Sequence, residues 1–159
     1  METSALYQRN ARVEATYLDE RSMVQELSTF LISRNGPVRC SHIASEFDYR
    51  SGRADLVGLG RDSVLYAFEA KLLRWREALE QARRNTCFAH YCYVALPKRA
   101  ADLAIKARDD FQRHGVGLLV LTGHEVRLAI RPRRNLPLLP WLTKLALAQL
   151  MNPEPTAVR

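Results

Sequence analysis

The stretch from Arg53 to Lys71, RADLVGLGRDSVLYAFEAK, constrains the fold of this chain more than any other segment. Two apolar runs flank a glycine-containing turn, which is the pattern of an antiparallel hairpin. The second run, residues 63–71, is apolar on both faces because its odd and its even positions both carry hydrophobic side chains. Strands of this kind lie in the middle of a sheet that helices cover on each side, so the hairpin predicts a layered α/β fold.

Charged residues interrupt these apolar strands: Asp55 in the first, and Glu69 and Lys71 in the second. Burying an unpaired charge costs several kcal/mol, so such groups need partners, a metal ion or a wet cleft. A three-residue loop would pair Gly60 with Val64 across the hairpin. This register places Asp55 directly opposite Glu69, with Lys71 diagonal to it on the same face. A two-residue loop would separate the acids unless a bulge intervened, and the glycines of the turn favour the longer loop or such a bulge.

Facing carboxylates repel each other, and a divalent cation between them relieves the repulsion. Oxygen ligands with room for water suit Mg²⁺, and a nearby lysine can hold a phosphate oxygen or a water on the metal. Asp55, Glu69 and Lys71 together would therefore make a phosphodiester hydrolase site. The same spacing is equally compatible with an Asp/Glu/Lys salt-bridge cluster at the end of a strand.

The remaining periodicity predicts one domain over residues 20–151, with an N-terminal arm or helix over 1–19 and a frayed tail over 152–159. Apolar side chains recur at helical spacing in residues 21–33, 72–82, 100–111 and 141–151. Strand-like segments are residues 38–47, 54–59, 63–71, 90–96, 116–121 and 126–130. An antiparallel meander followed by helix-linked strands implies a mixed β-sheet flanked by helices on both faces.

Basic residues exceed acidic ones, 24 against 17, giving a formal charge of +7. Much of the excess is arginine, whose planar guanidinium suits phosphate, so nucleic acid is the first partner to consider. Arg50 and Arg53 flank a turn. They could contact phosphate, or they could form a surface ion pair with Glu46 or Asp48. The densest basic run contains Arg131, Arg133 and Arg134, and its proline favours an extended backbone. Such a run could bind along a DNA backbone or could be a solvated linker.

The three cysteines, Cys40, Cys87 and Cys92, lack CxxC spacing and indicate a reducing compartment rather than a disulfide framework. Residues 87–92 read CxxHxC, but the surroundings are apolar and no second ligand pair follows, so we interpret them as packing residues rather than a zinc site. No run reaches about 18 apolar residues, and the start METSALYQRNAR lacks the apolar core of a signal peptide. We therefore expect a cytoplasmic protein without a membrane segment.

At Asp55 and the FEAK stretch that holds Glu69 and Lys71, the sequence resembles the PD-(D/E)XK nuclease superfamily, which includes restriction endonucleases and Holliday-junction resolvases. The resemblance covers roughly residues 21–121 and implies a restriction endonuclease-like core. It implies that Asp55 and Glu69, with the main-chain carbonyl of Ala70, bind Mg²⁺ or Mn²⁺, and that Lys71 orients the attacking water. The activity it implies is a metal-dependent endonuclease that hydrolyses DNA phosphodiester bonds by direct attack of a metal-activated water.

Other members of the superfamily suggest further site residues. Many carry an acid on the first helix, for which Glu26 is the first candidate and Glu20 the second, although Glu26 is equally compatible with a solvated flank of that helix. Gln81 resembles a glutamine that the recombination nucleases place near the site, but Asn85 stands where their tyrosine would be. Glu46 and Asp48 precede the first turn of the meander, and either could reach the metal or belong to a solvated turn.

Cutting both strands of a duplex or a junction would require a homodimer, and the last helix offers either its interface or packing on its own sheet. The partners expected are therefore DNA and a second copy of the chain, within a larger nucleoprotein complex where a partner directs cutting. The alternative is a nucleic-acid-binding or subunit module on the same fold, with catalysis supplied or regulated by a partner. RNA cleavage is a third reading, although nothing resembles an aromatic RNA-stacking sheet.

Overall fold

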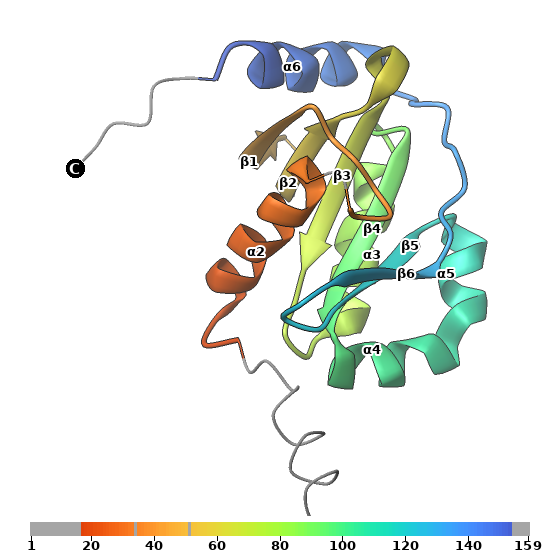
Figure 1. Ribbon diagram of the computed structural model, residues 1–159. Coiled ribbons are helices and arrows are strands. Elements are labelled where there is room, and N and C mark those ends of the chain that lie inside the picture. The colour runs from red at the N-terminus through yellow and green to blue at the C-terminus, as the bar shows by residue number, and fades with distance from the viewer. Residues whose placement is uncertain (1–16, 34, 51, 154–159) are drawn as a thin grey trace, which may run out of the picture.

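A six-stranded mixed sheet forms the centre of the protein, and its strands are hydrogen-bonded in the order in which they occur along the chain. The computed structural model describes residues 17–33, 35–50 and 52–153. The strands are β1 (His42–Tyr49), β2 (Gly52–Leu59), β3 (Leu65–Ala70), β4 (Tyr91–Pro97), β5 (Gly117–Leu121) and β6 (Val126–Ile130). The first three strands run antiparallel, β3, β4 and β5 run parallel, and β6 returns antiparallel to β5 (Figure 1). The expected meander followed by helix-linked strands is therefore confirmed.

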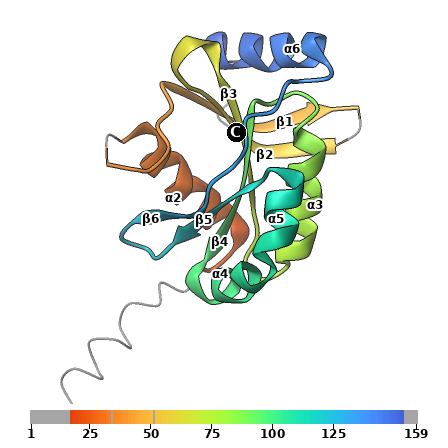
Figure 2. The same ribbon diagram turned by 90° about the vertical axis from the view of Figure 1, so that its right-hand side faces the viewer.

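Helices cover both faces of this sheet, as Figure 2 shows with the sheet seen from its side. One face carries α2 (Glu20–Ile32), whose Met23, Leu27 and Leu31 are buried. The opposite face carries α3 (Trp75–Asn85), α4 (Lys98–Ala104), α5 (Arg108–His114) and α6 (Pro140–Met151). A mixed sheet flanked by helices is thus the architecture predicted from the sequence.

Two hydrophobic clusters lie on the two faces of the sheet because successive strand residues point in opposite directions. In β3, Leu65 and Ala67 pack with the helices α3 to α6, whereas Phe68 and Ala70 pack with α2. Every residue of β3 except Tyr66 is buried. The prediction that this strand lies in the middle of the sheet is confirmed.

The hairpin between β2 and β3 has the predicted register. Gly60 N–H donates a 2.8 Å hydrogen bond to the Val64 carbonyl, so the turn consists of Arg61–Ser63, a short 3₁₀ segment. The ladder pairs Leu59 with Leu65 and continues to Leu56 paired with Phe68. The next pair in this register is Asp55 with Glu69, which is the arrangement that the three-residue loop requires.

Element boundaries differ from the sequence prediction in several places. β1 begins at His42 rather than Val38, and β2 begins at Gly52, so the β1–β2 turn is shorter than the predicted DYRSGR segment. The predicted helix over 100–111 is two helices separated by a 3₁₀ turn at Ile105–Ala107. This segment contains neither glycine nor proline that would mark the break in the sequence. After the break, Phe111 of α5 stacks on Trp75, with 6.1 Å between the ring centroids.

The last helix packs on its own sheet, one of the two roles expected for it. Leu142 and Leu150 are buried against the sheet, while Trp141 and Leu145 are 59% and 52% exposed. No helix among the described residues is long and apolar enough to cross a membrane. The expected N-terminal arm, apart from residues 17–19, and residues 154–159 of the expected tail lie outside the described residues.

Candidate active site

Asp55 and Glu69 meet on neighbouring strands at the end of β3. The carboxylate of Asp55 accepts a 2.8 Å hydrogen bond from the main-chain N–H of Ala70, the residue that follows Glu69. Asp55 is half-buried, whereas Glu69 is only 1% exposed. The hairpin register thus brings together the two acids that the sequence singles out.

The carboxyl group of Glu69 has a strongly shifted protonation equilibrium. Burial raises the pKa of Glu69, the nearby charge of Asp55 raises it further, and together they bring it to about 9. A hydrogen bond from Asn85 and the charge of Lys71 act in the opposite direction but are weaker. Without a bound cation, Glu69 therefore holds a proton at neutral pH.

A chain of hydrogen bonds fixes Glu69 from the side of α3. Asn85 donates from Nδ2 to Oε1 of Glu69 at 2.7 Å, and the hydroxyl of Tyr49 donates to Oδ1 of Asn85 at 2.6 Å. Asn85 is fully buried, and its side-chain amide has a partner for both its nitrogen and its oxygen. Buried amides are normally satisfied in this way, and the network locks the orientation of the Glu69 carboxyl.

Lys71 lies among acids but does not pair with Asp55 or Glu69. Its ammonium is 3.4 Å from the carboxylate of Glu20 on α2 and 3.7 Å from that of Glu77 on α3. Burial alone would lower the pKa of Lys71, but the charges of Glu20, Glu77 and Asp55 raise it above its ordinary value. Lys71 is therefore a fixed cation rather than a base at neutral pH.

The first helix brings Glu20, the second candidate acid, to this site. In Figure 1 the arrow of β3 ends beside the start of α2, and Glu20 also approaches the main-chain N–H of Leu72 at 3.5 Å. Glu26, the first candidate, lies beside Tyr17 instead. Burial of the Tyr17 hydroxyl and the neighbouring charge of Glu26 both raise the pKa of Tyr17.

Gln81, a further candidate from the sequence, lies one helical turn before Asn85 on α3. Its Oε1 is buried and has no hydrogen-bond partner among the described residues. A buried amide oxygen without a partner is uncommon and costs free energy. Gln81 is thus an available acceptor on the helix that also holds Glu69 in place.

The predicted nucleic-acid contacts occupy several separate positions. Arg53 is paired with Asp48 at 2.9 Å and with Glu46 at 3.7 Å, which is the surface ion pair that the sequence left open. Arg50 is exposed in the β1–β2 turn.

The three arginines of the dense basic run at residues 131–134 lie in different surroundings. The side chain of Arg133 packs against Gly115. If Gly115 carried a Cβ atom, that atom would lie 3.1 Å from a guanidinium nitrogen of Arg133. Arg131 and Arg134 line two different hollows on the protein. The segment therefore does not present a single row of cations.

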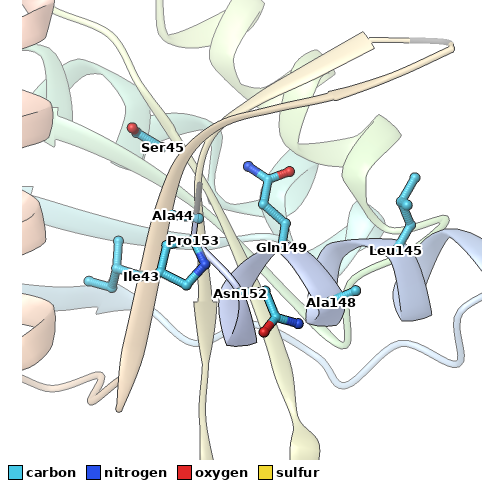
Figure 3. A pocket seen from close by; sticks show the side chains of 8 residues that line it. All are labelled: Ile43, Ala44, Ser45, Leu145, Ala148, Gln149, Asn152 and Pro153. Carbon is cyan, nitrogen blue, oxygen red and sulfur yellow. The ribbon is translucent and has the colours of Figure 1, made fainter. Parts of the chain in front are cut away.

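A hollow of about 650 Å³ between α6 and β1 has no acid, base or cation among the residues that line it. Figure 3 shows its walls, with Ile43 and Ser45 from β1 and Leu145 and Gln149 from α6. The described residues that line this hollow therefore offer no ionisable group for acid–base or metal chemistry.

The groups that could hold a metal ion are the carboxylates of Asp55 and Glu69 and the main-chain carbonyl of Ala70. No cluster of three or more His, Cys, Asp or Glu side chains with metal-binding geometry occurs among the described residues. A two-carboxylate site leaves most of the coordination sphere to water and substrate, which is how Mg²⁺ is usually held.

No protein-family model matches the chain, and no curated protein matches it. Among solved structures, the chain is similar to the SPO1766 protein of unknown function from Silicibacter pomeroyi. The two share 19% sequence identity, with a TM-score of 0.52 over 69% of this chain and 70% of that chain. At this level of identity the likeness concerns the fold alone.

The sequence did not point to the positioning roles of Tyr49, Glu77 and Asn85. One signal for Asn85 was present, because it continues the apolar stripe of α3 at helical spacing from Ala78 and Ala82. A polar residue in such a stripe needs a buried partner. Its partner, however, depends on how α3 docks on the sheet.

Proposed function

We propose that this protein is a metal-dependent endonuclease of the PD-(D/E)XK type, which hydrolyses DNA phosphodiester bonds by attack of water. The proposal includes a restriction endonuclease-like core made of α2, the meander β1–β3, α3 and β4. The order of these elements agrees with the superfamily, and the two acids lie at the expected strand positions. Fold alone does not imply activity, so the support comes from the site.

The observation that carries the proposal is the distribution of charge around the two inner carboxylates. A structural salt-bridge cluster would pair Lys71 with Asp55 or Glu69, but Lys71 is within 4 Å of Glu20 and Glu77 instead. Glu69 is left buried beside Asp55, with a neutral amide as its hydrogen-bonded partner. Two acids so close together must either keep a proton or bind a cation, and a divalent cation would take the place of the proton that Glu69 otherwise holds.

The residues present fit such a cation, which we propose to be Mg²⁺ or Mn²⁺. Asp55 and Glu69 would hold it together with the carbonyl of Ala70. When bound, a divalent cation supplies charge that polarises a phosphate and lowers the pKa of a coordinated water. Asn85 and Tyr49 keep Glu69 in one orientation, so that little reorganisation is needed when its proton is lost.

Lys71 would act on the phosphate and on the attacking water. Because acids surround it, its ammonium stays protonated and donates hydrogen bonds to oxygen atoms that carry negative charge. Glu20 and Glu77 hold the ammonium from two helices and restrict its position. Lys71 therefore contributes electrostatic stabilisation and orientation rather than proton abstraction.

The experiment that tests the proposal offers four substrates to the purified protein: supercoiled plasmid, linear duplex, single strand and a four-way junction. Each is incubated with Mg²⁺, Mn²⁺ or EDTA, with Asp55→Ala and Lys71→Ala variants in parallel. Lys98→Ala serves as the matched control, since Lys98 is an exposed lysine paired with Asp102. We expect metal-dependent cutting by the wild type and by the control only.

Two results would count against the proposal. If all substrates stay intact with every protein while DNA binding is retained, the chain is a binding or subunit module whose catalysis is supplied by a partner. If cutting survives both site variants, it comes from another site or a contaminant.

Cutting of both strands by a chain of this size would use a homodimer, which stays a prediction. Light scattering of the protein with and without a short duplex gives the mass that checks it. A monomer in both conditions would limit the proposal to single-strand cuts.

A further inference from the structure

A second site lies on the opposite face of the sheet from Glu69. It is a hollow of about 730 Å³ between the end of α2, the segment that follows it, and the first halves of β3 and β4. Tyr66 and Phe68 point to the face of the sheet that α2 covers. Glu69 points to the opposite face, because successive strand residues alternate. The hollow is also nearer the Gly60 turn than the carboxylates are, since Gly60 and Arg61 line it.

Tyrosines form the floor of this hollow. Tyr66 and Tyr91 are paired across β3 and β4, and their rings lie 5.6 Å apart at an angle of 26°. Tyr93 lies beside them. The centroid of its ring is 5.3 Å from that of Phe68, and the two rings are nearly parallel. Gly60 allows this arrangement, because an added Cβ would lie 2.4 Å from the ring of Tyr66.

The floor offers both ring surface and hydrogen-bonding groups. Tyr66 and Tyr91 are half-buried, so part of each ring is accessible. Within the described part of the chain, the hydroxyls of Tyr66, Tyr91 and Tyr93 have no hydrogen-bond partner. By contrast, the hydroxyl of Tyr49 donates to Asn85 at 2.6 Å. Tyrosine hydroxyls at a floor of this kind are available to a ligand.

Arginines form the rim. Arg39, Arg61 and Arg134 line the hollow and are exposed. None of them comes within 4 Å of a carboxylate of the described residues, although many other arginines of the chain do. Asp62 is the only acid among the residues that line the hollow. The rim therefore offers guanidinium groups that are free to bind an anion.

The basic surface continues beyond this hollow. Pro37 lines it and also lines a neighbouring hollow of about 620 Å³, in which Arg108 and Arg131 are found. Neither of these two arginines is paired with a carboxylate of the described residues; Arg108 donates instead to the carbonyl of Ala129. Arginines without a carboxylate partner among the described residues thus extend across two hollows that share Pro37, further than a single phosphate group requires.

We propose that this surface binds single-stranded nucleic acid, with a base stacked on the Tyr66–Tyr91 floor and the phosphates held by the surrounding arginines. Aromatic rings stack on any base, and arginine provides planar, bidentate contacts to phosphate. The tyrosine hydroxyls supply donors and acceptors for the edge of the stacked base. A free nucleotide has the same chemistry, but the arginines of the adjoining hollow favour a chain of phosphates. The proposal does not rest on the hydrolytic function, because it uses none of the residues of the carboxylate site.

The test measures the binding of a fluorescein-labelled dT12 oligonucleotide by anisotropy in EDTA, so that metal-dependent cleavage plays no part. Tyr91→Leu is expected to weaken binding by about tenfold, the usual effect of losing one stacked base. Tyr91→Phe keeps the ring and is expected to stay within about threefold of the wild type, because stacking and not the hydroxyl supplies most of the affinity.

The arginines are tested with the double variant Arg39→Ala/Arg61→Ala, whose exposed positions leave the fold intact. Each lost phosphate contact is expected to reduce the slope of log affinity against log salt by about 0.7. Arg113→Ala is the matched control, because Arg113 is an exposed arginine beside Asp110. Its affinity and salt slope should equal those of the wild type.

Three results would overturn this proposal: no binding of dT12 by the wild type, wild-type affinity in both Tyr91→Leu and the arginine variant, or equally tight binding of unlabelled dTMP in competition. The last result would assign the hollow to a free nucleotide. Loss of plasmid cutting in Asp55→Ala does not bear on these results, so failure of the hydrolytic proposal can be told apart from failure of this one.

Discussion

Asn85 donates a 2.7 Å hydrogen bond to the carboxyl of Glu69, and this bond links α3 to the most deeply buried acid among the described residues. The same Asn85 accepts a hydrogen bond from Tyr49 on β1. Glu69 is therefore fixed by a neutral amide while the charge of Asp55 acts on it from β2. The raised pKa of Glu69 and the stability that depends on it can therefore be measured without any substrate.

Replacing Asn85 with alanine removes both hydrogen bonds and leaves the buried carboxyl of Glu69 and the half-buried hydroxyl of Tyr49 without this partner. Loss of a buried partner typically costs about 1–3 kcal/mol, so we expect the free energy of unfolding to fall by that amount. The pKa of Glu69 should rise further, because the bond from Asn85 lowers it in the wild type. Urea unfolding of Asn85→Ala gives the stability, and Asn35→Ala, at an exposed position, is the control. Equal stability of the two variants would contradict the structural role of the network.

The stability of the metal-free protein should fall as the pH rises. Folded Glu69, with a pKa of about 9, keeps a proton that the unfolded chain releases at its ordinary value of 4.5. Between these two values the folded state binds more protons, so stability decreases with pH over this window. Glu69→Gln imitates the protonated form and should flatten the curve, with the largest gain in stability near pH 9.

Denaturant unfolding at pH 5, 7 and 9 measures this difference. Glu125→Gln is the control, because Glu125 is a surface acid that lies 3.7 Å from Arg127. Parallel stability curves for the wild type and Glu69→Gln would show that Glu69 titrates normally.

Lys71→Met should abolish cutting without abolishing metal binding. Lys71 is not a ligand of the proposed cation, and methionine keeps much of its apolar stem. Loss of one preorganised charged donor typically lowers the rate by about 10²–10³-fold. Single-turnover cleavage with Mn²⁺, together with the rise in melting temperature on adding Mn²⁺, separates the two effects. A variant that loses the metal-induced stabilisation along with the activity would place Lys71 in the structure of the metal site.

Glu20 and Glu26 offer a matched comparison on one helix. Glu20 approaches Lys71 at 3.4 Å, whereas Glu26 lies beside Tyr17. Glu20→Gln should lower the cutting rate by about tenfold or less, since Lys71 keeps Glu77 as a second partner and one partly exposed ion pair is worth about 1 kcal/mol. Glu26→Gln should leave the rate unchanged. A larger effect from Glu26→Gln would show that the helix presents a different acid to the site.

Much of the fold follows from patterns within single segments. The number of residues in the β2–β3 turn fixes which side chains face each other, so the juxtaposition of Asp55 and Glu69 was accessible from the sequence. The two apolar faces of β3 likewise required helices on both sides of the sheet.

The remainder depends on how separate elements dock. Apolar periodicity places a stripe along α2 but does not say which of its turns reaches β3, so spacing alone does not tell that Glu20 lies near Lys71. The contact between Tyr49 and Asn85 joins residues far apart in the sequence, and so does the stacking of Phe111 on Trp75. Such contacts have no signal in local composition.

Calorimetric titration of the metal-free protein with Mn²⁺ in two buffers of different ionisation enthalpy tests the central claim most directly. Binding should displace the proton of Glu69, so we expect one Mn²⁺ site with release of about one proton at pH 7, and less release as the pH approaches 9. Asp55→Asn and Glu69→Gln should each abolish this binding, while Lys71→Met should retain it. Unchanged Mn²⁺ binding in both acid variants, or no binding by the wild type, would contradict the assignment of Asp55 and Glu69 as a metal site.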